Sequence, residues 1–358
     1  MEIAVLGGGN GSLAAAADLT EQGHRVRLWR RSRETVDAMR AAGPLVVKDH
    51  LGSRPFVIAR ITSDLAEALD GAALIVCPTP ATAQADIAKH MAPLMRDGQV
   101  VFLPPGTFGS YLMAKAMRDA GNTADASFAE AGTLPWLTRK HGSGTIANTT
   151  RASRLPTGVL PLRNKDHALT AIREAFPSVE DAGDGLSGAL MNAGPIIHPP
   201  LILMNAGPIE HFERWDIHNE GTQPAIRRVT DALDAERIAT REALGYGAPH
   251  FPLIDHYTTS NWMYGNLAHD KLTDSGDWRE QLILTEHRYM REDVALGLAF
   301  LVSVAEWAGV PCPVARGLLA LGSAICGEDF RETGRTLEGL GLAGLDRAEM
   351  AAMLEAGP

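Results

Sequence analysis

Two histidines in the second half of the chain stand in almost identical surroundings. The segment 191–198, which ends in His198, recurs with one change thirteen residues later as the segment 204–211, which ends in His211. Thirteen residues turn an ideal helix through about 220°, so the two imidazoles cannot share one helix face. The prolines in both segments also disfavour a single straight helix. If one histidine takes part in chemistry, we therefore expect the other to be structural.

An acid lies on the apolar face of a helix predicted further along the chain. Apolar residues recur at helical spacing at Phe300, Val304 and Trp307, and one turn back along this stripe is Gly297. A further turn back is Asp293, which predicts a carboxylate on the buried face. Buried charges need a partner. An aspartate bonded to one ring nitrogen of a histidine would fix its tautomer and stabilise the imidazolium.

The spacing does not choose between His198 and His211 as the partner of that aspartate. Glu292 is expected to point away from the buried face, where Arg288 and Glu292 at i, i+4 would form a surface ion pair. No metal is expected, because the twelve histidines are scattered and neither His-Glu-x-x-His nor paired-cysteine spacing occurs. These residue types therefore predict acid–base chemistry without a metal.

A glycine-rich turn at the start of the chain predicts the site of a second reactant. Residues 2–6 and 24–29 have the apolar pattern of strands, and an alanine-rich helix is expected between them. This strand–turn–helix–strand order is the context that a dinucleotide fingerprint requires. Gly7 allows the tight turn and Gly9 lets the backbone approach a pyrophosphate, which the helix N-terminus would attract. The turn predicts cofactor contacts at Gly7, Gly9, Asn10, Gly11 and Ser12, the last replacing the commoner third glycine.

The end of the second predicted strand indicates which dinucleotide binds. NAD-binding sites usually place an acid there, whereas this chain has arginines at Arg30, Arg31 and Arg33 around Ser32. A guanidinium fork suits a phosphate, so Arg30 and Arg31 favour NADP(H) over NAD(H). The alternative is that these arginines merely solvate the start of a helix.

Composition bounds the class of protein. A net charge of −10 over 358 residues argues against a nucleic-acid partner. The cysteines, Cys77, Cys312 and Cys326, lack the spacing of a disulfide framework, which fits a reducing compartment. No apolar run reaches membrane-spanning length, and the first residues enter a strand without room for a signal peptide. We expect a soluble, cytoplasmic protein without a membrane partner.

Several further strands are expected to end in loops rich in glycine, proline and threonine. The predicted strands 73–77, 100–103 and 126–130 are apolar throughout, as in a parallel sheet covered on both faces. Such loops meet at one edge of the sheet, where ligands bind. We place further cofactor contacts there, at Pro78, Thr79, Pro105 and Glu130.

The remaining segments of the first half are assigned by their local patterns. Residues 45–62 show only short alternating stretches. Residues 33–42 form a predicted helix that ends at Gly43, and Ser63 is expected to cap a helix over 63–69. Segments near 158–162 and 179 would complete the domain.

The character of the sequence changes at about residue 184, after which the chain is helical. Apolar residues recur at helical spacing in 225–244 and 293–308. The predicted fold class is α/β, with a Rossmann-type parallel-sheet domain over residues 1–184 followed by an all-helical domain over 185–358. The substrate is expected between the domains. The apolar helices of 299–325 could support a homodimer or merely a core.

Five motifs give the chain a resemblance to a known family. They are the glycine-rich turn with Asn10, the segment from Asn192 to Pro199, the segment 233–239, Arg288-Tyr289 with Glu292-Asp293, and the tail with Asp329-Phe330-Arg331 and Gly334-Arg335-Thr336-Leu337. The chain resembles the opine dehydrogenases, the octopine and nopaline dehydrogenase family, and most closely the bacterial N-(1-carboxyethyl)-norvaline dehydrogenase branch. The resemblance covers essentially the whole chain.

This resemblance implies a reaction and a set of roles. His198 rather than His211 would be catalytic, because the family motif has proline after the histidine. Asp293 would be its partner, and Arg288, with Thr133 and Asn192, would bind substrate. The reaction would join an α-keto acid to the amino group of an amino acid, and the nicotinamide would reduce the resulting imine.

Two alternatives remain at this point. A ketopantoate reductase-like 2-keto acid reductase shares the front half, but its catalytic lysine has no counterpart in residues 186–190. A non-catalytic NADP(H)-binding sensor is the other, and the joint presence of His198, Asp293 and Arg288 argues against it.

Overall fold

The structure is a computed structural model, and it describes residues 1–142, 144–265, 268–274 and 278–358. Contacts divide the chain into two compact units. The first unit holds Met1–Thr79, Ala83–Ala189 and Ala352–Pro358, and the second holds Pro80–Thr82 and Leu190–Ala351. The predicted domain boundary between residues 184 and 185 stays a prediction.

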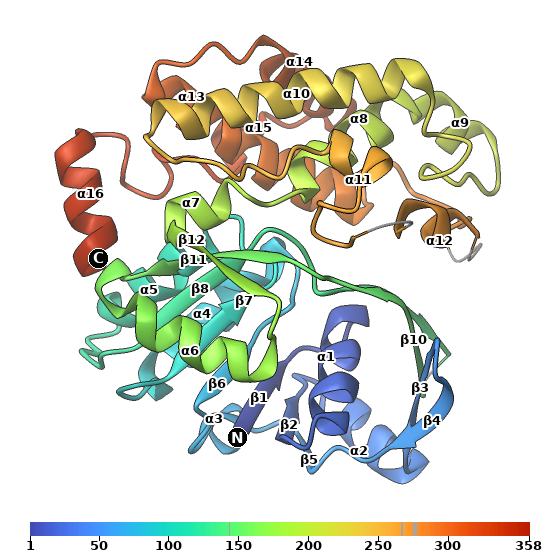
Figure 1. Cartoon of the computed structure of the whole chain (residues 1–358), viewed down its shortest axis with the longest axis vertical. Coiled ribbons are helices and arrows are strands. Elements are labelled where there is room, and N and C mark those ends of the chain that lie inside the picture. Colours follow the sequence, from blue (N-terminus) through green and yellow to red (C-terminus); the bar gives the residue numbers. More distant parts are fainter. Residues whose placement is uncertain (143, 266–267, 275–277) are drawn as a thin grey trace. The chain divides into compact units, whose positions relative to one another are not determined.

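An eight-stranded sheet forms the centre of the first unit, in the order β12-β11-β8-β7-β6-β1-β2-β5 (Figure 1). The strands from β8 to β5 in this order run parallel, whereas β11 is antiparallel to β8 and parallel to β12. The strands are β1 (Glu2–Leu6), β2 (Arg25–Trp29), β5 (Arg60–Thr62), β6 (Leu74–Val76), β7 (Val100–Leu103), β8 (Ser127–Ala131), β11 (Leu155–Leu160) and β12 (Val179–Asp184). This confirms the predicted Rossmann-type parallel sheet.

Helices connect these strands. They are α1 (Asn10–Glu21), α2 (Arg33–Ala42), α3 (Leu65–Leu69), α4 (Gln84–Met91), α5 (Gly109–Asp119), α6 (Lys165–Ala175) and α7 (Gly185–Ala189), with the 3₁₀ turns η1 (Ala81–Ala83), η2 (Ala92–Leu94) and η3 (Leu162–Asn164). The strands β6, β7 and β8 are buried along their whole length. Burial on both faces is why these strands are continuous apolar runs rather than alternating ones.

Two predicted helix starts differ in outcome. Helix α2 begins and ends as predicted: the Ser32 side chain accepts a hydrogen bond from the Thr35 amide, and Gly43 closes the helix with a φ of 79°. The prediction for α3 was wrong, because Asp64 rather than Ser63 caps it. The Asp64 carboxylate accepts hydrogen bonds from the amides of Ala66 and Glu67. A carboxylate also suits the positive end of the helix dipole.

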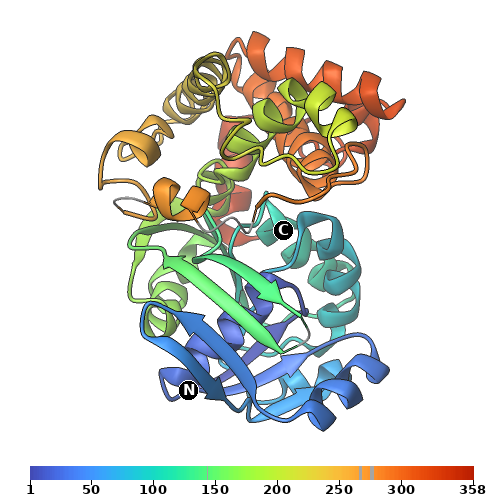
Figure 2. The same cartoon turned by 90° about the vertical axis from the view of Figure 1, so that its right-hand side faces the viewer.

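A second, four-stranded sheet was not predicted. Its order is β4-β3-β10-β9, from β3 (Leu45–Asp49), β4 (Gly52–Phe56), β9 (Trp136–His141) and β10 (Thr145–Arg151). Figure 2 shows β3 and β4 in blue beside β9 and β10 in green. Strand β3 pairs in parallel with β10, about a hundred residues later in the chain. This sheet packs against α1, the helix that follows the glycine-rich turn.

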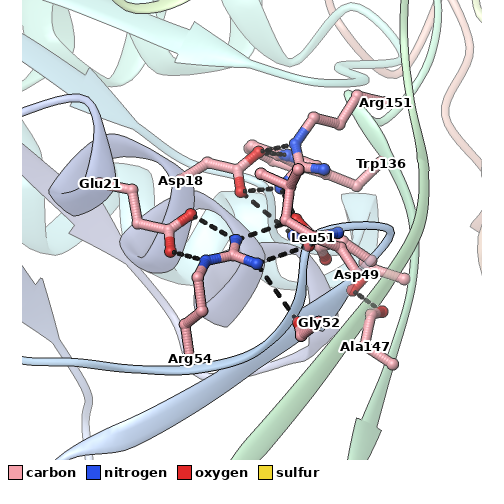
Figure 3. Close-up of polar contacts among 11 residues, drawn as sticks. Asp18, Glu21, Asp49, Leu51, Gly52, Arg54, Trp136, Ala147 and Arg151 are labelled. Carbon is pink, nitrogen blue, oxygen red and sulfur yellow. Dashed lines mark hydrogen bonds and ion pairs between the residues drawn. The ribbon is translucent and has the colours of Figure 1, made fainter.

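An ion-pair network joins α1 to this small sheet, as Figure 3 shows. We call Asp18, Glu21, Asp49, Arg54 and Arg151 the Asp18 cluster. Arg151 lies 2.7 Å from Asp18 and 2.8 Å from Asp49, and Arg54 lies 2.7 Å from Asp49 and 2.9 Å from Glu21. Trp136 and Asn148 also donate side-chain hydrogen bonds to Asp18. The network therefore fixes the far half of α1 to β3, β4 and β10.

The second unit is helical, which confirms the predicted helical C-terminal part. Its helices are α8 (Gly194–Met204), α9 (Ala206–His211), α10 (Pro224–Ala243), α11 (Ile254–Thr258), α12 (Ala268–Asp274), α13 (Ala299–Ala308), α14 (Pro313–Cys326), α15 (Phe330–Thr333) and the first half of α16 (Arg347–Ala356). A π-helix, η4 (Tyr289–Leu298), runs directly into α13. Helix α10 packs against α8, α13 and α14 (Figure 1). Among the described residues, no helix is long and apolar enough to cross a membrane.

Candidate active site

A histidine and an aspartate meet where α8 packs against η4. The Nδ1 atom of His198 lies 2.7 Å from the Oδ2 atom of Asp293. The Asp293 side chain is only 4% exposed and that of His198 13%. A buried carboxylate at this distance accepts the Nδ1 proton, so proton exchange with a substrate falls to Nε2. Asp293 therefore has the partner that its predicted burial required.

Missing side chains bring the two helices this close. A Cβ atom on Gly194 of α8 would lie 2.3 Å from the Oδ1 atom of Asp293. A Cβ atom on Gly297 of η4 would lie 2.3 Å from the Cγ atom of Pro195. Each glycine thus places a hydrogen atom where a Cβ atom would collide with a side chain of the facing helix, Asp293 or Pro195.

The prediction that Glu292 points to the surface was wrong. Its side chain is 9% exposed, and its Oε1 atom accepts a hydrogen bond of 2.9 Å from the Ala81 amide. Arg335 donates to the Ala81 carbonyl at 3.1 Å, so both backbone groups of Ala81 are held. The physical reason is the π-helix: wider turns change the rotation per residue, so neighbours Glu292 and Asp293 are both buried.

The two acids lie in an environment that favours their neutral forms. Burial raises the pKa of Asp293 to about 7, an effect that the positive charge of Arg288 opposes. Burial also raises the pKa of Glu292, again opposed by Arg288. Among the described residues, the Oε2 atom of Glu292 has no hydrogen-bond partner and lies 3.6 Å from the Nε atom of Arg288. The His198–Asp293 pair can therefore hold or release a proton near neutral pH.

The residues predicted to bind substrate lie in both units. The Arg288 side chain is half exposed beside Glu292, so its guanidinium can reach a ligand. Asn192 is buried, and its side-chain oxygen accepts a hydrogen bond of 3.0 Å from the Gly194 amide at the start of α8. Thr133 belongs to the first unit, where it is buried in the segment after β8. Their substrate contacts stay predictions.

His211 occupies a different part of the helical unit. It lies at the end of α9, exposed, with its ring against that of Phe212. It lines a surface hollow of about 450 Å³, together with Phe212 and Ile283. The break at Asn205 between α8 and α9 agrees with the expectation that the prolines exclude one straight helix. Asp293 is therefore bonded to the first histidine of the repeated segment.

Sequence reasoning missed two residues next to His198. The ring of Tyr289 stacks on the imidazole of His198, with centroids 3.6 Å apart and planes 8° apart. His218 is buried, and its Nε2 atom lies 3.0 Å from the Tyr289 hydroxyl. Tyr289 stands in the motif Arg288-Tyr289 that carries part of the family resemblance, but no role was predicted for it, and nothing in the local sequence indicates His218.

The glycine-rich turn of the first unit has the features of an anion site. Gly7 has a φ of 103°, which a side chain would strain, and its Cβ would lie 2.8 Å from atoms of Ser12 and Thr79. Gly9 precedes α1 with open space around it and no side-chain cap. The first turn of α1 carries no acid. Backbone amides and the helix dipole therefore meet a ligand there without a competing carboxylate, which fits a pyrophosphate.

The two arginines after β2 differ in their surroundings. Arg30 is half-buried, and a Cβ atom on Gly8 would lie 2.1 Å from the carbon of its guanidinium, so the group lies directly over the turn. Burial lowers the pKa of Arg30 below its usual value. Arg31 is exposed and pairs with Asp86 at 3.0 Å. The geometry thus favours Arg30 over Arg31 as a phosphate-binding group.

The other predicted cofactor residues also have structural partners. Asn10 accepts a hydrogen bond from the Lys140 amide at 3.0 Å, and the Ser12 hydroxyl donates to the Leu6 carbonyl at 3.0 Å. The side chain of Pro78 would meet a Cβ atom placed on Gly11 at 3.1 Å. Thr79 lies 3.3 Å from the Sγ atom of Cys77.

Glu130 lies near the end of β8, and Pro105 lies in the segment that follows β7. Glu130 is fully buried and accepts hydrogen bonds from the Phe108 amide at 2.7 Å and the Ser110 amide at 3.1 Å. It thereby holds the start of α5, the helix that follows Pro105. The predicted cofactor contacts of all these residues stay predictions.

Among the described residues, no group of three or more histidine, cysteine or acidic side chains could hold a metal ion. Together, a parallel sheet with an uncapped glycine-rich turn and a buried histidine–aspartate pair in a helical unit define a nicotinamide-dinucleotide-dependent dehydrogenase. The model of the NAD-dependent glycerol-3-phosphate dehydrogenase N-terminus matches residues 2–105. The model of the NAD/NADP octopine/nopaline dehydrogenase alpha-helical domain matches residues 182–326.

Similar proteins agree with both models. An opine dehydrogenase of Arthrobacter sp. (strain 1C) is 27% identical over 98% of each chain. An octopine dehydrogenase structure described with NADH and pyruvate has a TM-score of 0.72 at 19% identity, over 98% of each chain. A yersinopine dehydrogenase structure with NADP⁺ bound has a TM-score of 0.65 at 15% identity, over 99% of this chain and 98% of that one. These matches support the opine dehydrogenase family, whose members are NAD(P)-dependent oxidoreductases that act on CH–NH donors.

Proposed function

We propose that this chain catalyses the reductive condensation of an α-keto acid with the amino group of an amino acid, prefers NADPH, and uses His198 as its acid–base group. The product is an N-(carboxyalkyl) amino acid. The similarity of the chain to opine dehydrogenases over nearly its whole length supports the reaction. The observation that supports the acid–base assignment is the 2.7 Å contact between His198 and Asp293 inside the helical unit.

The residues of the helical unit account for the proton transfers. An amino acid arrives as an ammonium ion and must lose a proton before its nitrogen can attack a carbonyl carbon. His198 takes that proton at Nε2, and Asp293 stabilises the resulting imidazolium through Nδ1. The imidazolium returns the proton to the carbonyl oxygen as the carbinolamine forms. A second proton, which His198 takes from the carbinolamine nitrogen and passes to the hydroxyl, lets that oxygen leave as water and gives the protonated imine. The buried pair thus acts first as a base and then as an acid.

Arg288 orients the keto acid. Its guanidinium can hold a carboxylate by two parallel hydrogen bonds, and its side chain is half exposed. Fixing the carboxylate aligns the carbonyl for attack by the amine. The nicotinamide cofactor, when bound, supplies the hydride that reduces the imine carbon.

The preference for NADPH is supported by the position of Arg30. Its guanidinium lies over the glycine-rich turn. No acid directly follows β2 that could accept hydrogen bonds from the hydroxyls of a ribose. A guanidinium can bind the additional phosphate of NADP(H) in two-point fashion. The NADP⁺ named for the yersinopine dehydrogenase structure is in line with this preference.

The test is NADPH and NADH oxidation with a matrix of α-keto acids, each with and without a set of amino acids. Oxidation that requires both substrates supports the proposal. Oxidation with the keto acid alone would instead indicate a 2-keto acid reductase, and binding of NADPH without turnover across the matrix would indicate a sensor. An Arg30→Asp variant tests the cofactor preference independently of the reaction. It should lower kcat/KM for NADPH by about tenfold or more and leave kcat/KM for NADH unchanged.

A further inference from the structure

Tyr289 forms one side of the space around the proposed acid–base group. Its ring lies parallel to the His198 imidazole, with planes 8° apart and centroids 3.6 Å apart. The tyrosine is 4% exposed and lies one turn before Asp293 on η4. The guanidinium carbon of Arg288 lies 5.3 Å from the same ring centroid. One aromatic ring therefore contacts both the proposed base and the proposed carboxylate-binding group.

The hydroxyl of Tyr289 is anchored by a residue from another segment. The Nε2 atom of His218 lies 3.0 Å from this hydroxyl. His218 is itself fixed in a turn, because the Asp216 carboxylate accepts hydrogen bonds from the amides of His218 at 2.9 Å and Asn219 at 3.1 Å. The ring of Trp278 lies edge-on to that of His218, with centroids 5.1 Å apart. The Tyr289 side chain is thus held at one end by the backbone of η4 and at the other by the hydrogen bond of its hydroxyl.

A single hydrogen bond does not fix an imidazole. The contact between Nδ1 and Asp293 sets the distance, but it still lets the ring swing about the line that joins the two atoms. A flat ring stacked at 3.6 Å removes this freedom, because tilting the imidazole would bring it into contact with the tyrosine. The stack therefore sets the direction in which Nε2 points.

We infer that Tyr289 is a positioning residue for His198, and that the hydrogen bond between the Tyr289 hydroxyl and His218 keeps Tyr289 in place. This inference rests on the proposed function, because it assigns the stack a purpose only if His198 exchanges protons with substrate. Misdirecting a catalytic group by about 1 Å can cost on the order of a hundredfold in rate. A stack that served only the core would affect stability and leave the chemistry unchanged.

The variants separate the ring from its anchor. Tyr289→Leu removes the stack, and we expect it to lower kcat by about a hundredfold with KM values within about threefold of wild type. Tyr289→Phe removes only the anchoring hydrogen bond, and His218→Leu removes it together with the ring contact to Trp278; each should lower kcat by about three- to tenfold. The double variant should be no slower than the slower single variant, because both changes remove one interaction. His218→Gln, which keeps a polar group near the position of Nε2, should recover part of the loss.

A matched control accounts for the loss of a partly buried aromatic ring. Tyr257→Leu removes a tyrosine from α11, whose ring contacts Arg227, and should leave kcat unchanged while lowering the Tm by a comparable amount. Proton NMR of the His198 Nδ1–H signal gives a readout independent of turnover. We expect Tyr289→Leu to broaden or shift this signal, and Tyr257→Leu to preserve it.

Two failures can be told apart. Wild-type protein without amine-dependent NADPH oxidation would overturn the proposed function, whatever the variants do. Active wild type together with an unchanged kcat in Tyr289→Leu would overturn the positioning role alone. If Tyr289→Leu does not fold, Tyr289→Phe and His218→Leu decide the question, since both keep the size of the core side chains near that of the original.

Discussion

Each unit of this chain buries a group of charged side chains, and the two groups are built on opposite principles. In the Asp18 cluster, every carboxylate oxygen of Asp18, Glu21 and Asp49 accepts a hydrogen bond. In the helical unit we call His198, Arg288, Glu292 and Asp293 the His198 cluster. There the Oε2 atom of Glu292 has no hydrogen-bond partner among the described residues.

The pKa values follow this difference in pairing. Hydrogen bonds from Arg54 hold the pKa of Asp49 well below its usual range, against the opposing effect of burial. In the His198 cluster burial dominates and raises the pKa of both acids, that of Asp293 to about 7. Fully paired acids are locked in one charge state and can only hold structure, whereas partly paired acids can change charge at neutral pH. The comparison fits a stabilising role for the first cluster and the proposed proton transfer by the second.

Removing the acid of the His198 cluster should have the largest effect. We expect Asp293→Asn to lower kcat by about a thousandfold, because a neutral amide does not stabilise the imidazolium of His198. The matched control is Asp231→Asn on α10, where burial also raises the pKa of the acid, and its kcat should stay at the wild-type value. Steady-state kinetics with saturating substrates measure both, and equal kcat values for the two variants would contradict the assignment.

The same variant should change how stability depends on pH. Between pH 4 and 7 folded Asp293 retains a proton that the unfolded chain has lost, so the wild-type free energy of unfolding falls as pH rises through this window. Asp293→Asn lacks this contribution and should gain stability relative to wild type at pH 8 but little at pH 4. Urea unfolding at both pH values tests the sign.

Breaking the Asp18 cluster should cost stability and leave the chemical step unchanged. Arg151→Met leaves Asp18 and Asp49 with fewer donors, and we expect the free energy of unfolding to fall by roughly 2–3 kcal/mol. Lys115→Met, which breaks the exposed pair with Asp119, should cost less than about 0.5 kcal/mol. A hundredfold loss of kcat in Arg151→Met would show that the cluster does more than hold α1 and the small sheet together.

Acid should weaken the Asp18 cluster through Asp49. Its lowered pKa means that the folded carboxylate stays charged where the unfolded one binds a proton, so stability is present above about pH 4 and is lost as pH falls below it. Arg54→Met removes the largest cause of the lowered pKa. Its free energy of unfolding should therefore fall less steeply than that of wild type between pH 5 and pH 2. If the free energy of unfolding depends equally on pH in the two proteins, Arg54 does not cause the lowered pKa of Asp49.

The smallest effect is expected from Glu292→Gln. The amide oxygen can still accept the hydrogen bond from Ala81, but the side chain can no longer ionise beside Arg288. A substrate carboxylate would then meet less repulsion, and we expect the KM for the keto acid to fall by about threefold with the affinity for NADPH unchanged. A rise in that KM would instead mean that Glu292 positions Arg288.

The sequence patterns predicted the parallel sheet better than anything else in the molecule. Strands buried on both faces, such as β6 and β7, are continuous apolar runs and therefore stand out locally. The strands of the small sheet mix apolar and polar residues and find partners far away in the chain, as β3 does with β10. Such pairing leaves little trace in any one segment.

The site was predicted in part for a similar reason. Periodicity placed Asp293 on the buried face, but it assumed an α-helix and so put Glu292 at the surface. A π-helix is rare and is not signalled by composition. The choice of His198 came from the resemblance of its segment to a family motif, because spacing alone left His211 open. Tyr289 and His218 lie together only after two distant segments have folded.

The glycines at the crossing of α8 and η4 have a consequence for how the chain can vary. The distance between the imidazole and its acid depends on two positions, Gly194 and Gly297, that carry no functional group at all. A methyl group added at either position would collide with the facing helix. All reactive atoms would still be present, but they would no longer be in contact. A variant of this chain that retains the geometry must therefore keep glycine at both positions as strictly as it keeps the histidine.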